Sequence, residues 1–305
     1  NNVAIGRNAL GTEDGNGKNV AIGNSTLATL NAGVDAYNVA VGYEAGYAIS
    51  TGIENTIIGG LAGDALTTGR YNVAVGMYAL STEDGHGFNV AIGRSALQTL
   101  NAGIDAYNVA VGYDAGAAMS TGPYNTIVGA LAGDALTTGD RNVAIGTSAL
   151  GAETAYGKNV AIGTNALTIQ NAGADTYNVA VGYNAGLAVT TGVSNTLIGG
   201  QAGDSLTTGG YNVAIGRAAL ATENAHGRNV AIGYEALYTL DAGADAYNIA
   251  IGYKAGTAIT TGPNNVIIGG LAADALTTGS NNIAIGVGAL GAEDGSSYNI
   301  AIGTN

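Results

Sequence analysis

The chain of 305 residues has no cysteine and no tryptophan, a single phenylalanine, two prolines and few charged residues. Without cysteine it cannot form a disulfide scaffold or a cysteine-ligated zinc fold. Lysine and arginine total nine and the net charge is −13, so the basic surface typical of a nucleic-acid-binding protein is missing. No apolar run approaches the roughly 18 residues of a membrane-spanning helix.

Small residues dominate the composition instead. Glycine accounts for 52 residues, and 47% of the chain is hydrophobic, which is incompatible with the low hydrophobicity of a disordered chain. Glycine does not occupy every third position, so a collagen helix is also excluded.

A pentapeptide close to Asn-Val-Ala-Ile-Gly recurs eighteen times, first at Asn2 and last at Asn299. The spacings between copies are 17, 19, 17 and 17 residues and then repeat, which adds a longer period of 70 residues. No linker interrupts the pattern. We therefore expect residues 1–305 to form a single continuous repeat domain of 17- and 19-residue coils.

Each pentapeptide predicts a short strand, because it is β-branched and bounded by Asn and Gly. The glycine that ends it is expected to have a positive φ at a corner. The rest of each coil predicts a second, weaker strand between two turns. Stacked in register, such coils form an all-β solenoid whose parallel strands lie about 4.8 Å apart.

The strand composition makes two further predictions. The asparagines should stack into an amide ladder, which includes Asn19, Asn38, Asn55, Asn72 and Asn89. Val and Ile point to one face of the strand and Ala to the other, so both faces are apolar. One face can fill the coil and the other needs a partner, so we expect several copies of the chain to pack laterally.

Acidic residues recur at equivalent positions of the 70-residue cycle. Two aspartate columns are candidate calcium ligands, since carboxylates suit a hard cation, although such residues also bond to turn amides. No cofactor other than calcium is expected, and the calcium-loop motif Gly-Gly-x-Gly-x-Asp is absent. The aspartates are Asp35, Asp105, Asp175 and Asp245, and Asp64, Asp134, Asp204 and Asp274. A glutamate column comprises Glu13, Glu83, Glu153, Glu223 and Glu293.

Two tyrosine columns are candidate ligand contacts, because tyrosine rings stack on sugars or on a partner protein; the alternative is that they cover the neighbouring turn. They are Tyr43, Tyr113, Tyr183 and Tyr253, and Tyr37, Tyr107, Tyr177 and Tyr247. The extra two residues of each 19-residue coil, within residues 31–37 and their equivalents, predict a repeated bulge for binding or lateral contact. His86 and His226 have varied equivalents and are interpreted as surface residues.

Residues 19–23 and 89–93 resemble the Asn-Ser-Val-Ala-Ile-Gly head repeat of YadA-like trimeric autotransporter adhesins, and match all of it except the Ser. The resemblance covers the whole chain. It implies a left-handed parallel β-roll, three chains wound around one axis and adhesion at a bacterial surface. Thr-Thr-Gly turns such as residues 67–69 also resemble phage tail-fibre shafts. The longer coils and the strict 70-residue cycle depart from typical adhesin heads.

We therefore expect an elongated homotrimeric β-roll that serves as a structural and adhesive segment of an extracellular fibre, on a bacterial cell surface or a virion. Its expected partners are itself and a cell-surface glycan or extracellular protein, through multivalent attachment. The alternative is a purely structural, self-assembling filament or matrix protein without a receptor. An ice-binding solenoid is less favoured, because paired threonines recur mainly in two coils of every four. No nucleophile elbow or phosphate loop is present, and no enzymatic activity is expected.

Overall fold

The computed structural model describes residues 1–14 and 17–304. These residues form short strands and turns without any helix, so the expectation of an all-β fold is confirmed. They divide into two compact units, residues 1–155 and 156–305. Among the described residues, no helix is long and apolar enough to cross a membrane.

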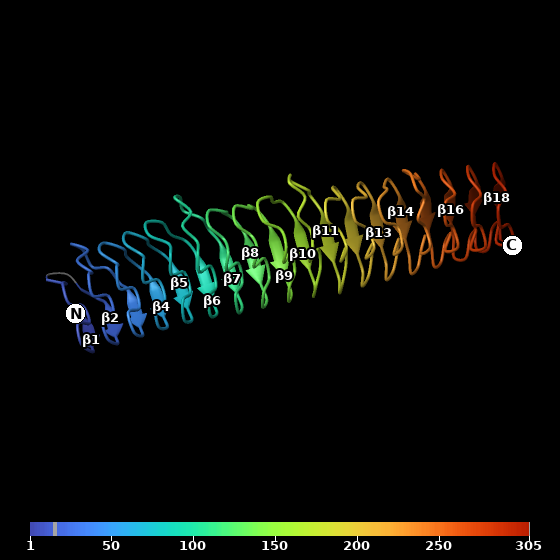
Figure 1. Cartoon of the computed structure of the whole chain (residues 1–305). Helices are drawn as coiled ribbons and strands as arrows, with labels where there is room; N and C mark the ends of the chain where they lie inside the picture. The colour runs from blue at the N-terminus through green and yellow to red at the C-terminus, as the bar shows by residue number, and fades with distance from the viewer. Residues whose placement is uncertain (15–16, 305) are drawn as a thin grey trace. The chain divides into compact units, whose positions relative to one another are not determined.

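Each unit is a parallel β-solenoid with one strand of three residues per coil (Figure 1). The first unit contains β1 (Val3–Ile5), β2 (Val20–Ile22), β3 (Val39–Val41), β4 (Thr56–Ile58), β5 (Val73–Val75), β6 (Val90–Ile92), β7 (Val109–Val111), β8 (Thr126–Val128) and β9 (Val143–Ile145). The second contains β10 (Val160–Ile162), β11 (Val179–Val181), β12 (Thr196–Ile198), β13 (Val213–Ile215), β14 (Val230–Ile232), β15 (Ile249–Ile251), β16 (Val266–Ile268), β17 (Ile283–Ile285) and β18 (Ile300–Ile302).

Within each unit, every strand pairs in parallel with the strand of the next coil, and equivalent residues face each other. The register holds across a 19-residue coil, where Ala21 pairs with Ala40, as it does across a 17-residue coil, where Ala40 pairs with Ile57. The two extra residues are therefore absorbed outside the strand. The predicted parallel solenoid is confirmed.

The interior of the coil is lined by the middle residue of each strand. In β2 to β17 this residue is buried, whereas the residues on either side of it remain partly or fully exposed. The coil is narrow, and Ala fits its interior in three coils of every four. The Val and Ile columns consequently face outward.

Interior side chains compensate for one another in volume. In the coil of β6, Ala91 is accompanied by the buried Leu97. In the coil of β8, Ile127 takes the place of the alanine and Gly133 takes the place of the leucine. A Cβ at Gly133 would lie 2.9 Å from Leu136 Cδ1 and 3.3 Å from Ile127 Cδ1, so the interior leaves little room beside these two side chains. In the fourth cycle the equivalent position beside Ile267 is occupied by the small residue Ala273.

The expected second strand does not form in the described residues, and that prediction was wrong. The segment after each strand is a series of turns, and residues such as Ser95 and Leu97 have φ values of 57° and 49°. A left-handed residue cannot continue an extended strand. Ser95 donates its N–H to Met77 O (2.9 Å) in the preceding coil, and Leu97 donates to Ala115 O (3.0 Å) in the following coil. The backbone is thus satisfied in both directions without a strand.

The buried asparagines form a ladder. Direct amide-to-amide bonds, such as Asn55 Nδ2 to Asn38 Oδ1 at 3.1 Å, occur at four described positions, and the bond that recurs in every coil runs from the side chain to the backbone. In each unit, Oδ1 of every asparagine accepts the backbone N–H of the asparagine one coil later, at 2.8–3.1 Å. The Nδ2 of Asn38 and of Asn108 donates instead to a turn carbonyl of its own coil, Gly52 O (2.8 Å) or Gly122 O (2.9 Å). An asparagine with both bonds therefore joins neighbouring coils and also closes its own coil. In one coil of each cycle Nδ2 donates instead to the glycine two residues earlier, as in Asn19 to Gly17 O at 3.4 Å.

The glycine that follows each strand has the expected positive φ, between +129° and +145° in all described copies. It also stacks directly on its equivalent. A Cβ on Gly59 would lie 2.5 Å from Gly76 O and 2.6 Å from Gly76 C. Both the backbone conformation and the close approach of the next coil exclude a side chain here.

This glycine column predicts a sharp contrast between two adjacent residues. We expect Gly59→Ala to lower the free energy of unfolding by about 2–5 kcal/mol, because it combines backbone strain with overpacking. Gly60→Ala is the matched control, since no atom lies within 4 Å of its Cβ position and the equivalent residue one cycle later is Ala130. Chemical or thermal unfolding of both variants measures the difference, and equal stabilities would contradict the steric argument.

Candidate functional site

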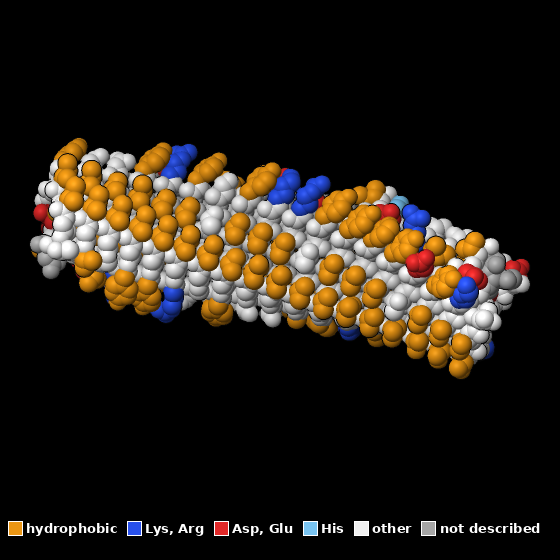
Figure 2. Space-filling model, turned by 180° about the vertical axis from the view of Figure 1, so that it is seen from behind, with side chains coloured by type: hydrophobic (Ala, Val, Ile, Leu, Met, Phe, Trp, Pro, Cys, Tyr) orange, Lys and Arg blue, Asp and Glu red, His pale blue; other side chains and the backbone are white. Residues whose placement is uncertain are grey.

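The outward strand face carries two columns of Val and Ile along each unit. Ile92 in β6, Ile198 in β12 and Ile268 in β16 are each 37–38% exposed. The first residue of the strand is one of the two outward positions, and it is threonine instead of Val or Ile in one coil of each of the first three cycles. These threonines are Thr56, Thr126 and Thr196. Figure 2 shows hydrophobic side chains in rows that cross successive coils. This face is apolar and regular, and a single chain leaves it open to water.

The first tyrosine column lies two residues after the third strand of each cycle. Tyr43, Tyr113, Tyr183 and Tyr253 are 50–60% exposed. Neighbouring coils contact some of these rings, since Arg94 donates to Tyr113 Oη at 3.3 Å and Tyr234 stacks on Tyr253 with centroids 5.5 Å apart. About half of the surface of each ring therefore stays exposed, and its role as a ligand contact stays a prediction.

The second tyrosine column is more fully used within the solenoid. Lys18 Nζ donates to Tyr37 Oη at 2.8 Å, and Arg228 donates to Tyr247 Oη at 2.8 Å. In the second cycle the rings of Tyr71, Phe88, Tyr107 and Tyr124 stack in succession, with centroids 4.8–5.8 Å apart. Within this column the stacking covers both faces of Tyr107, although the four tyrosines are 48–57% exposed, nearly as much as those of the first column.

The two-residue insertion of the 19-residue coils projects from the solenoid. Nothing lies within 4 Å of a Cβ built on Gly33, Gly103, Gly173 or Gly243. Val34 and Ile104 next to them are about half exposed. The predicted bulge therefore exists in both units, and whether it binds a ligand or another chain stays a prediction.

The first aspartate column caps the backbone of the preceding coil. The carboxylates of Asp35, Asp105, Asp175 and Asp245 accept the N–H of Gly17, Gly87, Gly157 and Gly227 at 3.0–3.3 Å. Three of them also pair with a cation, as in Lys18–Asp35 at 2.8 Å, and the hydrogen bond from Lys18 lowers the pKa of Asp35. These contacts are those of a turn-capping residue, and the calcium hypothesis for this column stays a prediction.

The second aspartate column is partly buried. Burial raises the pKa of Asp64, Asp134 and Asp204, while hydrogen bonds from local backbone N–H groups act in the opposite direction. Asp204 also lines a small polar pocket with Arg217, Glu235 and Tyr238. Asp274, the fourth member, lines a separate pocket with Leu271 and Glu293. Among the described residues, no aspartate of this column forms a group of potential metal ligands with an aspartate of the first column.

The glutamate column points into the coil, which the sequence did not predict. Glu83, Glu153 and Glu223 are fully buried at the inward position that Leu100, Met119 and Leu136 occupy in the other coils. Burial raises the pKa of Glu83 and Glu223, although hydrogen bonds from backbone N–H groups favour their ionised forms. Alignment of the coils at their Gly residues would have revealed this, because the glutamate falls in a column of large apolar residues.

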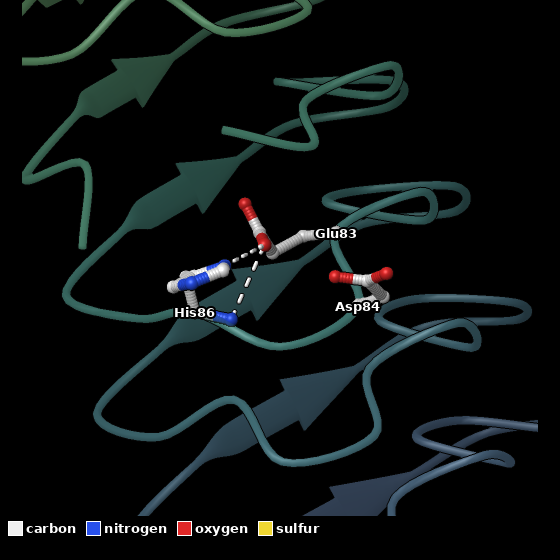
Figure 3. A group of neighbouring side chains, drawn as sticks. All are labelled: Glu83, Asp84 and His86. Atoms are coloured by element: carbon white, nitrogen blue, oxygen red, sulfur yellow. Dashed lines mark hydrogen bonds and ion pairs between the residues drawn. The ribbon is translucent and has the colours of Figure 1, made fainter. Parts of the chain in front are cut away.

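Two of these glutamates adjoin a histidine. His86 Nδ1 lies 3.7 Å from Glu83 Oε1, and His226 Nδ1 lies 3.7 Å from Glu223 Oε1. The side chains of His86 and His226 are 35% and 30% exposed, in keeping with their expected place at the surface, but both Nδ1 atoms are buried. Figure 3 shows the carboxylate of Glu83 directed at the imidazole of His86, with Asp84 beside it.

No family model, curated protein or solved structure matches this chain. The similarity to adhesin heads and tail-fibre shafts therefore depends on the repeated motif alone. Any function must be argued from the surfaces and clusters just described.

The second aspartate column predicts a pH effect on stability. A carboxyl group whose pKa is raised by folding binds its proton more tightly in the folded state, so stability falls as pH rises above the ordinary value of 3.8. We expect the double variant Asp134→Asn, Asp204→Asn to gain thermal stability relative to the parent as pH increases from 3 to 7. Glu54→Gln, at an exposed carboxyl, is the control. A constant difference at all pH values would contradict the prediction.

Proposed function

We propose that this chain is a structural and adhesive segment of an extracellular fibre in which three copies wind as a left-handed β-roll and pack through their outward strand faces. The role is non-enzymatic. The fibre belongs to a bacterial cell surface or a virion, and it presents repeated surface features for multivalent attachment to a glycan or extracellular protein.

The outward Val and Ile columns carry this proposal. The second outward position is Val or Ile in every strand, and the first is interrupted only by Thr in β4, β8 and β12. A partner of the same periodicity can therefore bury these columns, and a second copy of the chain has that periodicity. Burial of such side chains contributes about 25 cal/mol per Å² of apolar surface, which accumulates over the nine strands of each unit. The resemblance of the repeated motif to the head repeats of trimeric adhesins supports an assembly of three chains.

Lateral assembly predicts that a charge on the outward face dissociates the chains. We expect residues 1–305 to sediment at equilibrium as a trimer, and Ile92→Glu with Ile198→Glu to sediment as a monomer. A glutamate projects into water from a single chain but would be buried without a partner in the assembly, which costs several kcal/mol.

The control variant is Val109→Thr, because Thr126 occupies the same column one coil later. It should remain trimeric. A monomeric parent chain would contradict lateral assembly, and so would a glutamate variant that stays assembled. Sedimentation with a calcium chelator tests in the same experiment whether a carboxylate-bound ion holds the chains together.

Adhesion predicts that the first tyrosine column contributes to ligand binding. We expect the trimer to bind cell surfaces or immobilised glycans, and replacement of Tyr43, Tyr113, Tyr183 and Tyr253 by Asn to weaken binding by about 10²-fold or more, because avidity multiplies weak contacts. Asn24 occupies the equivalent position in another coil, so folding should be retained.

Replacement of Tyr37, Tyr107, Tyr177 and Tyr247 by Ser is the comparison, since Ser194 occupies that position elsewhere. These rings are engaged within the solenoid, so their loss should affect binding less. A chain that binds no cell or glycan and instead polymerises end to end would contradict the adhesive role and favour the filament.

A further inference from the structure

The buried glutamate of the second cycle belongs to a group of potential metal ligands. Its Oε1 accepts the N–H of His86 at 3.3 Å, and its Oε2 accepts the N–H of Ala102 in the next coil at 3.3 Å. One ligand atom each from Glu83, Asp84 and His86 lies within 4.8 Å of the others (Figure 3). The three residues are adjacent in sequence, so one turn positions the whole group.

The imidazole nitrogen of this group has no hydrogen-bond partner. His86 Nδ1 is buried and directed at a fully buried carboxylate, yet it lies 3.7 Å from Glu83 Oε1, beyond hydrogen-bond distance. His226 Nδ1 is in the same situation beside Glu223. A buried polar atom of this kind requires an explanation, and an ion between the nitrogen and the carboxylate supplies one.

The same donor set recurs in the second unit with one carboxylate relocated. Glu223 and His226 keep their geometry, and Oε2 of Glu223 accepts the N–H of Ala242 at 3.4 Å. The second acid is now Asp241, from the following coil, and its ligand atom lies within 4.8 Å of the other two. Asp84 of the second cycle corresponds to Asn224 here, and Asn101 corresponds to Asp241. Each cycle that has the histidine therefore keeps one Glu and one Asp beside it.

This chemistry favours a divalent ion that accepts both nitrogen and oxygen. Two carboxylates and one neutral imidazole match the three protein ligands of an open zinc site, in which water completes the coordination. Ligand atoms around tetrahedral zinc lie about 3.3 Å apart, so the nitrogen–oxygen pair needs a shift of only a few tenths of an ångström. Calcium requires six to eight oxygen ligands, which this group does not provide.

We propose that Glu83, Asp84 and His86 bind one zinc-type divalent ion, and that Glu223, His226 and Asp241 bind a second. The inference is independent of the proposed adhesive function. Each ion offsets the negative charge of a buried carboxylate, Glu83 or Glu223, at the interior position that is occupied by leucine in coils such as that of Leu100. In the second unit the ligands come from two successive coils, so the ion joins those coils.

Isothermal titration of residues 1–305 with Zn²⁺ tests the sites. We expect two ions per chain for the parent, one for His86→Asn and none for the double variant with His226→Asn. Asparagine is the residue at the equivalent position of the first cycle, Asn16, and both histidine side chains are about one-third exposed, so the variants should fold. Zn²⁺ should raise the thermal midpoint of the parent and leave that of the double variant unchanged.

Removal of a single carboxylate provides a second measurement that does not alter the histidines. We expect Asp84→Asn to weaken zinc affinity at the first site by at least about tenfold. Mutation of a residue that only hydrogen-bonds to a metal ligand already lowers affinity by about that factor, and Asp84 is proposed to be a ligand itself. Glu54→Gln, outside both groups, should change nothing. Absence of Zn²⁺ binding to the parent, or undiminished binding to the double histidine variant, would overturn the proposal. Displacement of Zn²⁺ by equimolar Ca²⁺ would overturn the choice of ion.

Discussion

The buried asparagine at the start of each strand is the interaction on which the rest of the solenoid depends. Its Oδ1 accepts the next coil's backbone N–H. In the other coils of each cycle, apart from the one that contains Asn19 or its equivalents, its Nδ2 reaches a carbonyl near the end of its own coil, as in Asn55 to Gly69 O at 2.9 Å. One side chain thus sets both the spacing between coils and the closure of each coil. A shift of register would leave several buried polar groups unpaired in every coil, each at a cost of about 1–3 kcal/mol. This penalty keeps 17- and 19-residue coils in one register.

The narrow interior follows from this closure and decides which residues can enter it. Alanine in the strand is accompanied by leucine in two coils of each cycle and by glycine in a third, as at Ala40 with Gly46. The larger strand residue is accompanied by glycine at Ile57 with Gly63, and by alanine at Ile267 with Ala273. The inward strand position takes Ile or Leu only once in each cycle, and the other Val and Ile residues of the strands form the outward columns. The apolar outer face is therefore a consequence of the thin core as well as a candidate interface.

The polar columns differ in how far contacts within the solenoid explain their recurrence. The first aspartate column caps turn N–H groups and pairs with Lys or Arg, which explains its recurrence without a ligand. The second tyrosine column is engaged by cations and by neighbouring rings. The buried glutamates differ, because a carboxyl group replaces leucine in the interior and, in two cycles, lies beside an imidazole nitrogen that has no hydrogen-bond partner. Structural need alone does not account for that arrangement.

The amino-acid sequence by itself determined the length of each coil, the position of every strand, the parallel register and the glycine corners, because each of these follows from local residue preferences repeated at a constant spacing. The tertiary structure alone decided that alanine faces inward, since a strand apolar on both faces does not reveal which side is enclosed. It also replaced the expected second strand by left-handed residues such as Leu97, which bond to coils on both sides. The meeting of Asp241 with Glu223 and His226 likewise depends on the stacking of one coil on the next, because residues that are distant in sequence become neighbours only when the backbone ladder is complete.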